Sequence, residues 1–148
     1  MYISTKIFDN YSVALRQHKA QHSHCKLLHG YALKFKVWFT TKELDDMNWV
    51  VDFGGFGHMG LKDWMNDMFD HTLLIEKDDP YLDFFQSAAM EGLCKLQVMD
   101  KMGCESLAKL VFDKFNDTLS KQDGARCRVI KVEVFENNKN SAIYEADK

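Results

Sequence analysis

The chain has 148 residues, 46% of them hydrophobic and 28% charged, and a net charge of −3. A chain of this length predicts a single domain over residues 1–148 that buries a sizeable core. The small negative charge provides no basic field for nucleic acid, so we expect no nucleic-acid partner.

The cysteines and the hydropathy pattern argue against several further classes of protein. The four cysteines contain no CxxC pair, which disfavours a structural zinc ribbon and a thioredoxin-type redox pair. Cys94, Cys104 and Cys127 have apolar neighbours, and we expect them to be buried thiols. The sequence has no signal-peptide pattern and no apolar run of about 18 residues that could span a membrane. We therefore expect a cytoplasmic protein with reduced thiols and no membrane partner.

The first predicted elements are two long strands. Residues 1–15 are rich in β-forming side chains such as Tyr2, Ile7 and Val13. Residues 16–26 are polar and contain three histidines, which predicts a loop. In residues 27–41, apolar side chains alternate with a second, partly charged set, as in a strand whose two faces differ.

The second half of the chain predicts two helices followed by two strands. Residues 61–69 and 105–119 place apolar side chains at helical spacing. Residues 126–136 and 141–145 are rich in β-formers, and residues 93–99 allow a short additional strand. Without that strand the order is ββααββ, which predicts an α+β fold, an antiparallel four-stranded sheet with two helices packed on one face. Such a sheet has open edges and an uncovered face, so we expect self-association.

The segment over residues 18–29 contains four of the six histidines and Cys25. Neutral imidazole is a preferred zinc ligand, and a catalytic zinc needs three protein ligands and one open position. A metal site is therefore one interpretation, and a solvated His-rich loop is the other. Cys25 stands between His24 and Lys26, and positive neighbours favour the reactive thiolate. The alternative is a small buried thiol.

Further carboxylates are candidates for chemistry. Asp70 precedes His71, and a carboxylate beside a histidine can fix its tautomer and raise its basicity; the alternative is a histidine at a helix end. Glu105 opens the second predicted helix, where an acidic residue also complements the helix dipole. Glu136 ends a strand, and its carboxylate could accept two N–H donors from a guanidine-like ring edge; the alternative is a surface glutamate.

The order of these segments resembles the 6-pyruvoyl/6-carboxytetrahydropterin synthase family, whose fold is the T-fold. The resemblance covers nearly the whole chain, and six motifs follow one another in family order. In this chain they read YSVAL at residues 11–15, CKLLHGY at 25–31, VVDF at 50–53, FDH at 69–71, GCESLA at 103–108 and VFEN at 134–137.

The resemblance implies roles for individual residues. Cys25 is the counterpart of a catalytic thiol that shuttles a proton, with Asp70 and His71 as its partners in a relay. The pterin ring edge is implied to meet Glu136 and, as a second contact, Glu105. These five residues form the expected catalytic and substrate-binding set.

The same resemblance implies a catalytic zinc ion, but two positions depart from the family. His29 is the counterpart of the first histidine of the family's HGH pair, whereas Tyr31 stands at the second. Leu15 aligns with the histidine that ends the first strand. Either the metal is lost, or histidines of the loop rebuild the site. We expect rebuilding, with Zn²⁺ held by His29, His18 and His24.

The function implied by the resemblance is that of a lyase acting on 7,8-dihydroneopterin triphosphate. We favour the 6-carboxy-5,6,7,8-tetrahydropterin synthase type, which serves 7-deazaguanine (queuosine precursor) biosynthesis, over the pyruvoyl-forming type of tetrahydropterin biosynthesis. The alternative is a divergent T-fold protein that binds a pterin or purine with altered or no lyase chemistry. A T-fold hydrolase or reductase is a third hypothesis, since a shared fold does not fix function. The family assembles as trimers or hexamers, and we expect the same here.

Overall fold

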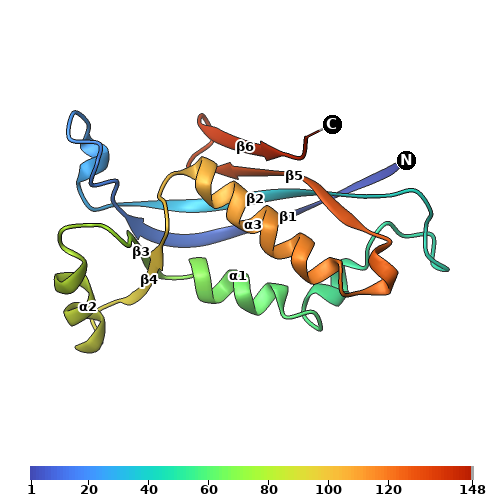
Figure 1. Ribbon diagram of the computed structural model, residues 1–148, viewed down its shortest axis with the longest axis horizontal. Coiled ribbons are helices and arrows are strands. Elements are labelled where there is room, and N and C mark those ends of the chain that lie inside the picture. Colours follow the sequence, from blue (N-terminus) through green and yellow to red (C-terminus); the bar gives the residue numbers. More distant parts are fainter. Residues whose placement is uncertain (148) are drawn as a thin grey trace.

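The protein is described by a computed structural model over residues 1–147, with the backbone alone at Asp123. Within this range, six strands and three α-helices are the main elements (Figure 1). The strands are β1 (Tyr2–Leu15), β2 (His29–Thr41), β3 (Thr72–Glu76), β4 (Lys95–Met99), β5 (Arg128–Phe135) and β6 (Ser141–Glu145). The α-helices are α1 (Leu61–Phe69), α2 (Leu82–Met90) and α3 (Cys104–Leu119), and the connections contain the short 3-10 helices η1 (His24–Lys26), η2 (Phe53–Phe56) and η3 (Asp123–Ala125).

The predicted four-stranded antiparallel sheet with two helices, in the order ββααββ, is wrong. The sheet has six strands in the order β4-β3-β1-β2-β5-β6, and it is mixed because β3 pairs in parallel with both β1 and β4. The segment β3–α2–β4 is inserted between α1 and α3. All five residues of β3 are buried, so its sequence lacks the alternation by which a half-exposed strand is identified. Helix α2 is as short as α1, but Phe85 is its one buried residue, so its sequence lacks the stripe of buried apolar side chains that identified residues 61–69.

Strands β1 and β2 form the long antiparallel centre of the sheet. They pair along almost their whole length, with Leu15 opposite His29 at one end and a bulge between Phe8 and Tyr11. Asn10 lies in the bulge with a φ of 64°, a left-handed conformation that asparagine tolerates better than most residues. The one extra residue allows both halves of β1 to keep their apolar side chains on the same face of the sheet.

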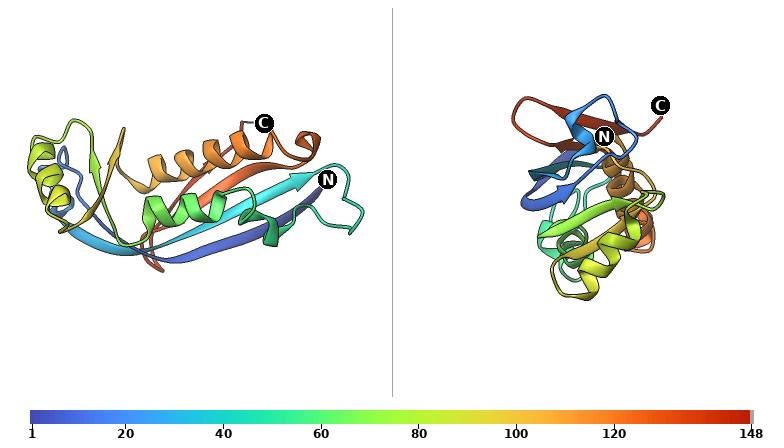
Figure 2. Two further views of the ribbon diagram at one scale, coloured as in Figure 1. Left: turned by 90° about the horizontal axis from the view of Figure 1, so that it is seen from below. Right: turned by 90° about the vertical axis from the view of Figure 1, so that its left-hand side faces the viewer.

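Helices α1 and α3 lie side by side along that apolar face (Figures 1 and 2). Phe35 of β2 is fully buried beneath them, with its ring centroid 4.6 Å from that of Phe69 and 5.9 Å from that of Tyr11. None of the helices in residues 1–147 has the length and apolarity needed to cross a lipid bilayer. The buried residues of α3 recur at helical spacing and are Leu107, Ala108, Val111, Phe115 and Leu119.

Helix α2 covers the opposite face of the sheet at its β3–β4 end. Leu74 of β3 belongs to the main core, whereas its neighbours Leu73 and Ile75 pack with Phe85 of α2 in a second, smaller core. Successive side chains of a strand point to opposite faces, which explains this division. As a result, α2 and the turn that precedes it lie at the same end of the molecule as the loop between β1 and β2 (Figure 2).

Replacing Phe35 with alanine should lower the free energy of unfolding by about 3–5 kcal/mol, because it opens a cavity beside two other aromatic rings. Urea unfolding followed by circular dichroism measures the change. Phe84→Ala is the matched control, since Phe84 is 67% exposed and its loss should cost about 1 kcal/mol or less. Equal losses in the two variants would contradict this packing.

Candidate active site

Two carboxylates that are distant in the sequence converge on one polar cavity. Glu105 lies in the first turn of α3, and Glu136 directly follows β5. We regard their cavity as the candidate site because it combines carboxylates, a thiol and amides, which together suit a polar ligand. A hollow beside β1 is larger, at about 520 Å³. The cavity measures about 320 Å³ and is lined by Gln17, Gly103, Cys104, Glu105, Glu136, Asn140, Ser141 and Ala142.

Gly103 is required at the start of α3. Its φ of 122° is a value that residues with a side chain rarely adopt. A Cβ atom at this position would lie 3.2 Å from Glu105 Oε2 and 3.3 Å from Gln17 Nε2. Gln17 Nε2 in turn donates a hydrogen bond of 3.4 Å to the Met102 carbonyl. Glycine therefore allows the Glu105 carboxylate and the segment after β1 to approach each other closely.

Tyr31 extends from β2 toward Glu136. Burial, the charge of Glu136 and a hydrogen bond with Glu136 raise the pKa of Tyr31 to about 12. Cys25 and Cys104 act on this pKa in the same direction, so both sulfur atoms lie near the phenol. The Tyr31 hydroxyl is therefore a neutral donor at physiological pH. Sequence reasoning identified Tyr31 as a departure from the family and missed its contact with Glu136, which no local spacing indicates.

Two cysteines lie near these carboxylates, and their environments differ. Burial raises the pKa of Cys104 to about 12, and the charges of Glu136 and Glu105 act in the same direction. Cys104 is thus a protonated thiol at neutral pH, and it packs against the main core as expected while it also lines the polar cavity. Cys25 is half-buried in η1, and its carbonyl accepts a hydrogen bond of 2.7 Å from the main-chain N–H of Gln17. Of the two, Cys25 remains the candidate for thiol chemistry.

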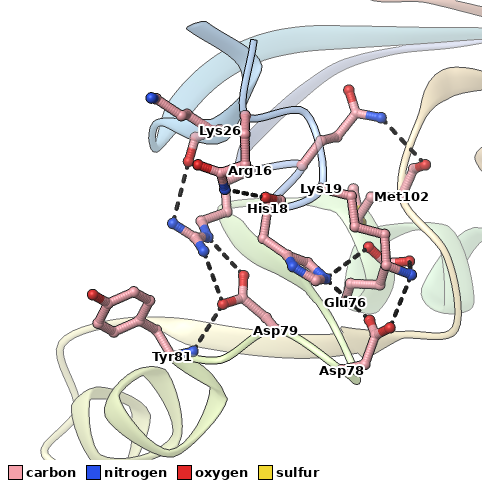
Figure 3. Close-up of polar contacts among 11 residues, drawn as sticks. Arg16, His18, Lys19, Lys26, Glu76, Asp78, Asp79, Tyr81 and Met102 are labelled. Atoms are coloured by element: carbon pink, nitrogen blue, oxygen red, sulfur yellow. Dashed lines mark hydrogen bonds and ion pairs between the residues drawn. The ribbon is translucent and has the colours of Figure 1, made fainter. Parts of the chain in front are cut away.

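The loop that carries Cys25 is attached to the turn between β3 and α2 (Figure 3). Arg16 forms a two-pronged ion pair with Asp79, at 2.6 and 3.1 Å, and also donates to the Lys26 carbonyl at 3.2 Å. The Asp79 side chain is fully buried, and it accepts a further hydrogen bond of 2.9 Å from the Tyr81 amide. Because Arg16 and Lys26 stand near the two ends of the loop, the Arg16 guanidinium holds both ends in place.

Two further basic side chains of the loop face the same turn. His18 Nε2 lies 3.1 Å from Asp78 Oδ1 and 3.4 Å from Glu76 Oε2. Lys19 Nζ lies 2.9 Å from Asp78 Oδ2 and 3.6 Å from Glu76 Oε1. Hydrogen bonds from Lys19 and then from His18 lower the pKa of Asp78 to about 2. The loop is therefore held on the turn mainly by opposite charges.

Asp70 and His71 contact each other at the end of α1. His71 Nδ1 lies 2.8 Å from Asp70 Oδ1, and His71 has a left-handed φ of 54°. The His71 side chain is 83% exposed, while Asp70 lines the larger hollow beside β1. Neither is among the described residues that line the cavity of Glu105 and Glu136. Within one chain, the expected relay and the carboxylate cavity are therefore separate.

The three histidines expected to bind zinc do not form one group among the described residues. His29 Nδ1 lies 2.7 Å from the Leu27 carbonyl, and His24 is exposed. His18 is turned instead toward the carboxylates near the β3–α2 turn. In residues 1–147, the side chains that lie close enough to share a metal ion are His18, Glu76 and Asp78.

The residues at positions 15 and 31 explain why the family's zinc site is not present. Leu15 pairs with His29 across β1 and β2 and is 5% exposed, so an apolar side chain stands next to the remaining histidine. The Tyr31 phenol, with its pKa of about 12, is protonated at neutral pH and a poor ligand. His29 alone does not hold a catalytic zinc ion. The residues present do not fit the family's zinc set, and we derive no chemical step through that metal.

The fold and the cavity define a class of protein, a small α+β domain in which carboxylates from a helix start and a strand end line one polar cavity. The chain belongs to the 6-pyruvoyl tetrahydropterin synthase family, because that family's model matches residues 3–147. The 6-carboxy-5,6,7,8-tetrahydropterin synthase of Rickettsia bellii (strain RML369-C) is 33% identical over 55 residues, which cover 37% of this chain and 39% of that protein. The match to these curated relatives thus spans about two fifths of their length.

Solved structures of low sequence identity have the same fold. An uncharacterised protein from Wolinella succinogenes has a TM-score of 0.79 at 20% identity, covering 99% of this chain and 98% of that one. The 6-pyruvoyl tetrahydropterin synthase of Caenorhabditis elegans has a TM-score of 0.63 at 21% identity, with coverage of 99% and 98%. The enzyme of the same name from Plasmodium vivax has a TM-score of 0.68 at 11% identity over the full length of both chains. These likenesses establish the fold.

Asp79→Asn should lower the free energy of unfolding by about 3 kcal/mol at pH 7, because it leaves the Arg16 guanidinium without its buried counter-charge. Burial by itself would raise the pKa of Asp79, but the bonds from Arg16 and the Tyr81 amide outweigh it and hold this pKa below its usual value. The stabilisation is therefore complete above the ordinary aspartate pKa and is lost as the pH falls through the lowered one.

Urea unfolding of both proteins at several pH values measures this effect, and the difference between them should shrink in acid. Asp46→Asn is the control, because Asp46 is exposed and its loss should cost about 0.5 kcal/mol or less. A difference between Asp79→Asn and wild type that grows in acid would contradict the ion pair.

Thiol reagents at pH 8 should modify Cys25 faster than Cys104. With a pKa of about 12, Cys104 is a thiolate in only about one molecule in ten thousand at that pH. Peptide mass spectrometry after brief treatment with iodoacetamide measures both rates. Cys104→Ala should leave the reaction at Cys25 intact, and faster modification of Cys104 would reverse the assignment of the two thiols.

Proposed function

We propose that the chain is a pterin lyase of the 6-carboxytetrahydropterin synthase type that acts on 7,8-dihydroneopterin triphosphate. The observation that carries the proposal is the convergence of Glu105 and Glu136 on one cavity, with the Tyr31 hydroxyl hydrogen-bonded to Glu136. Membership of the synthase family and the names of the curated relatives support it. We further propose a cytoplasmic role in 7-deazaguanine (queuosine precursor) or tetrahydropterin biosynthesis.

In this proposal the pterin ring is bound by its guanidine-like edge. A carboxylate can accept two parallel N–H bonds from such an edge, and charge makes these bonds strong and directional. Glu136 would supply this acceptor pair, and the neutral Tyr31 hydroxyl would hold its carboxylate in place. Glu105, on the wall of the same cavity, would accept a further ring N–H.

Cys25 is the residue proposed to move a proton. Its thiolate would take a proton from a carbon of the substrate side chain, and the electron pair left on that carbon would form a double bond as the triphosphate leaves. Cys104 does not compete for this role, because its raised pKa keeps it neutral. No step is assigned to a metal ion.

We also propose that the chain assembles as a trimer or hexamer. Strands β4 and β6 are the edges of the sheet, and unpaired edges favour contact with another chain. Ile3, Ile7 and Ile143 are about half exposed, and they lie on the face of the sheet away from α1 and α3. The exposed Asp70–His71 pair could serve in the relay only if a neighbouring copy brought it to the cavity.

A second candidate function is binding of a pterin or purine without lyase chemistry. It is favoured by Leu15 and Tyr31, which stand where the family's zinc ligands are expected and leave His29 without partners for that ion. The ring-binding carboxylates are present in both candidates. The two candidate functions therefore differ in whether the ligand is turned over, and both predict that a pterin or purine binds.

Cys25→Ala should abolish turnover of 7,8-dihydroneopterin triphosphate and leave its binding unchanged, because the thiol acts on the side chain and not on the ring edge. Glu136→Gln should weaken binding by about 10- to 100-fold, since it removes charge-assisted hydrogen bonds. Chromatography of the products measures turnover, and calorimetric titration measures binding.

Cys94→Ala is the control, because Cys94 packs in the small core beside α2 and should affect neither quantity. Normal turnover in Cys25→Ala would refute the role of the thiol. Binding without turnover in the wild type would select the second candidate, and failure to bind a pterin or purine would refute both.

A further inference from the structure

A second cluster of ligand-type side chains lies outside the carboxylate cavity, where the Cys25 loop meets the end of β3 (Figure 3). His18, Glu76 and Asp78 each offer one ligand atom there, and these atoms lie within 4.8 Å of one another. The side chains of His18 and Glu76 are only 11% and 9% exposed, whereas that of Asp78 is 51% exposed. The cluster is thus largely buried on two sides and open to solvent on the third.

Two of the three distances match those between ligands that share one small cation, and the third is at most 4.8 Å. Tetrahedral zinc with bonds of about 2.0–2.1 Å separates its ligand atoms by about 3.3 Å. Here Nε2 of His18 lies 3.1 Å from Oδ1 of Asp78 and 3.4 Å from Oε2 of Glu76. One imidazole and two carboxylates on three sides of a point leave a fourth side free for water or another ligand.

The two oxygens of each carboxylate are divided between two partners. Oε2 of Glu76 and Oδ1 of Asp78 face His18, whereas Oε1 of Glu76 and Oδ2 of Asp78 face Lys19. Lys19 therefore approaches from the outer side, where it can orient both carboxylates without standing between the three ligand atoms. Outer groups that orient metal ligands in this way are a regular feature of metal sites.

Glu76 is the most buried of the three side chains, and its two basic partners contact it only at long range. Its side chain is about nine-tenths buried, and the basic nitrogens that face it stand at 3.4 Å in His18 and 3.6 Å in Lys19. Both contacts are longer than an ordinary hydrogen bond of about 2.9 Å, so a metal ion between the three ligand atoms would bind this carboxylate at shorter range.

We propose that His18, Glu76 and Asp78 bind a divalent transition-metal ion, with zinc as the first choice. Imidazole favours zinc over magnesium or calcium, and two carboxylates balance the charge of a divalent ion. The site differs from the three-histidine set considered above, because it shares only His18 with it. Binding would join the Cys25 loop to the end of β3, and the proposal stands independently of the pterin chemistry.

The test uses the full chain, stripped of metal with a chelator and titrated with zinc chloride by calorimetry, with elemental analysis of the dialysed complex. Wild type should bind about one zinc ion per chain. His18→Ala and Glu76→Gln should each weaken zinc binding by at least about 100-fold. Loss of a residue that only orients a ligand costs roughly 10- to 100-fold, and these two residues are ligands themselves. Glu76→Gln keeps the shape of the side chain, so it carries the test should His18→Ala fail to fold by circular dichroism.

Two matched variants separate ligation from simple attachment of the loop. His29→Ala should bind zinc as tightly as wild type, and Lys19→Ala should lose clearly less affinity than His18→Ala, because Lys19 supplies no ligand atom. The proposal is overturned if wild type takes up no zinc, if Lys19→Ala loses as much affinity as His18→Ala, or if affinity is lost in His29→Ala and kept in His18→Ala.

Discussion

The long antiparallel pairing of β1 with β2 is the interaction on which the rest of the structure depends. β3 pairs in parallel with β1, and β5 pairs with β2 on the other side, so both halves of the sheet are built on this central pair. Its apolar face is the surface on which α1 and α3 pack. Its open end carries the loop with Cys25. The side chain of Tyr31, the third residue of β2, projects from the strand near that end. A change in the pairing register would therefore move the core and the site together.

The connection at that end of the pair is polar, and this has a physical consequence for the site. A loop with few apolar side chains has little hydrophobic energy to hold it. Here a buried, two-pronged ion pair from Arg16 to Asp79 and the outer pairs of His18 and Lys19 attach it to the β3–α2 turn. The inserted segment β3–α2–β4 thus has a role beyond enlarging the sheet, because it supplies the carboxylates that position the thiol-bearing loop.

Several features could be predicted from the sequence because they are local. The alternation in β2 and the helical spacing of α3 appear within a few turns of chain, and the motifs around Cys25, Glu105 and Glu136 indicated the family. Strand β3 could not be recognised in the same way, since both of its faces are buried and its five residues show no alternation. The predicted antiparallel sheet of four strands failed for this reason, as the parallel strands β3 and β4 require partners that no local pattern identifies.

The sequence by itself determined the family and the two long central strands, because each depends on residue types at short spacing, and it indicated Glu105 and Glu136 as candidates for ligand binding. Only the tertiary structure decided which groups meet. It brought Glu105 and Glu136 to one cavity, set Tyr31 against Glu136, and surrounded Cys104 with burial and negative charge that keep its thiol protonated. It also turned His18 away from His29 toward Glu76 and Asp78. Such choices depend on distances and charges between segments far apart in the chain, which no spacing in the sequence encodes.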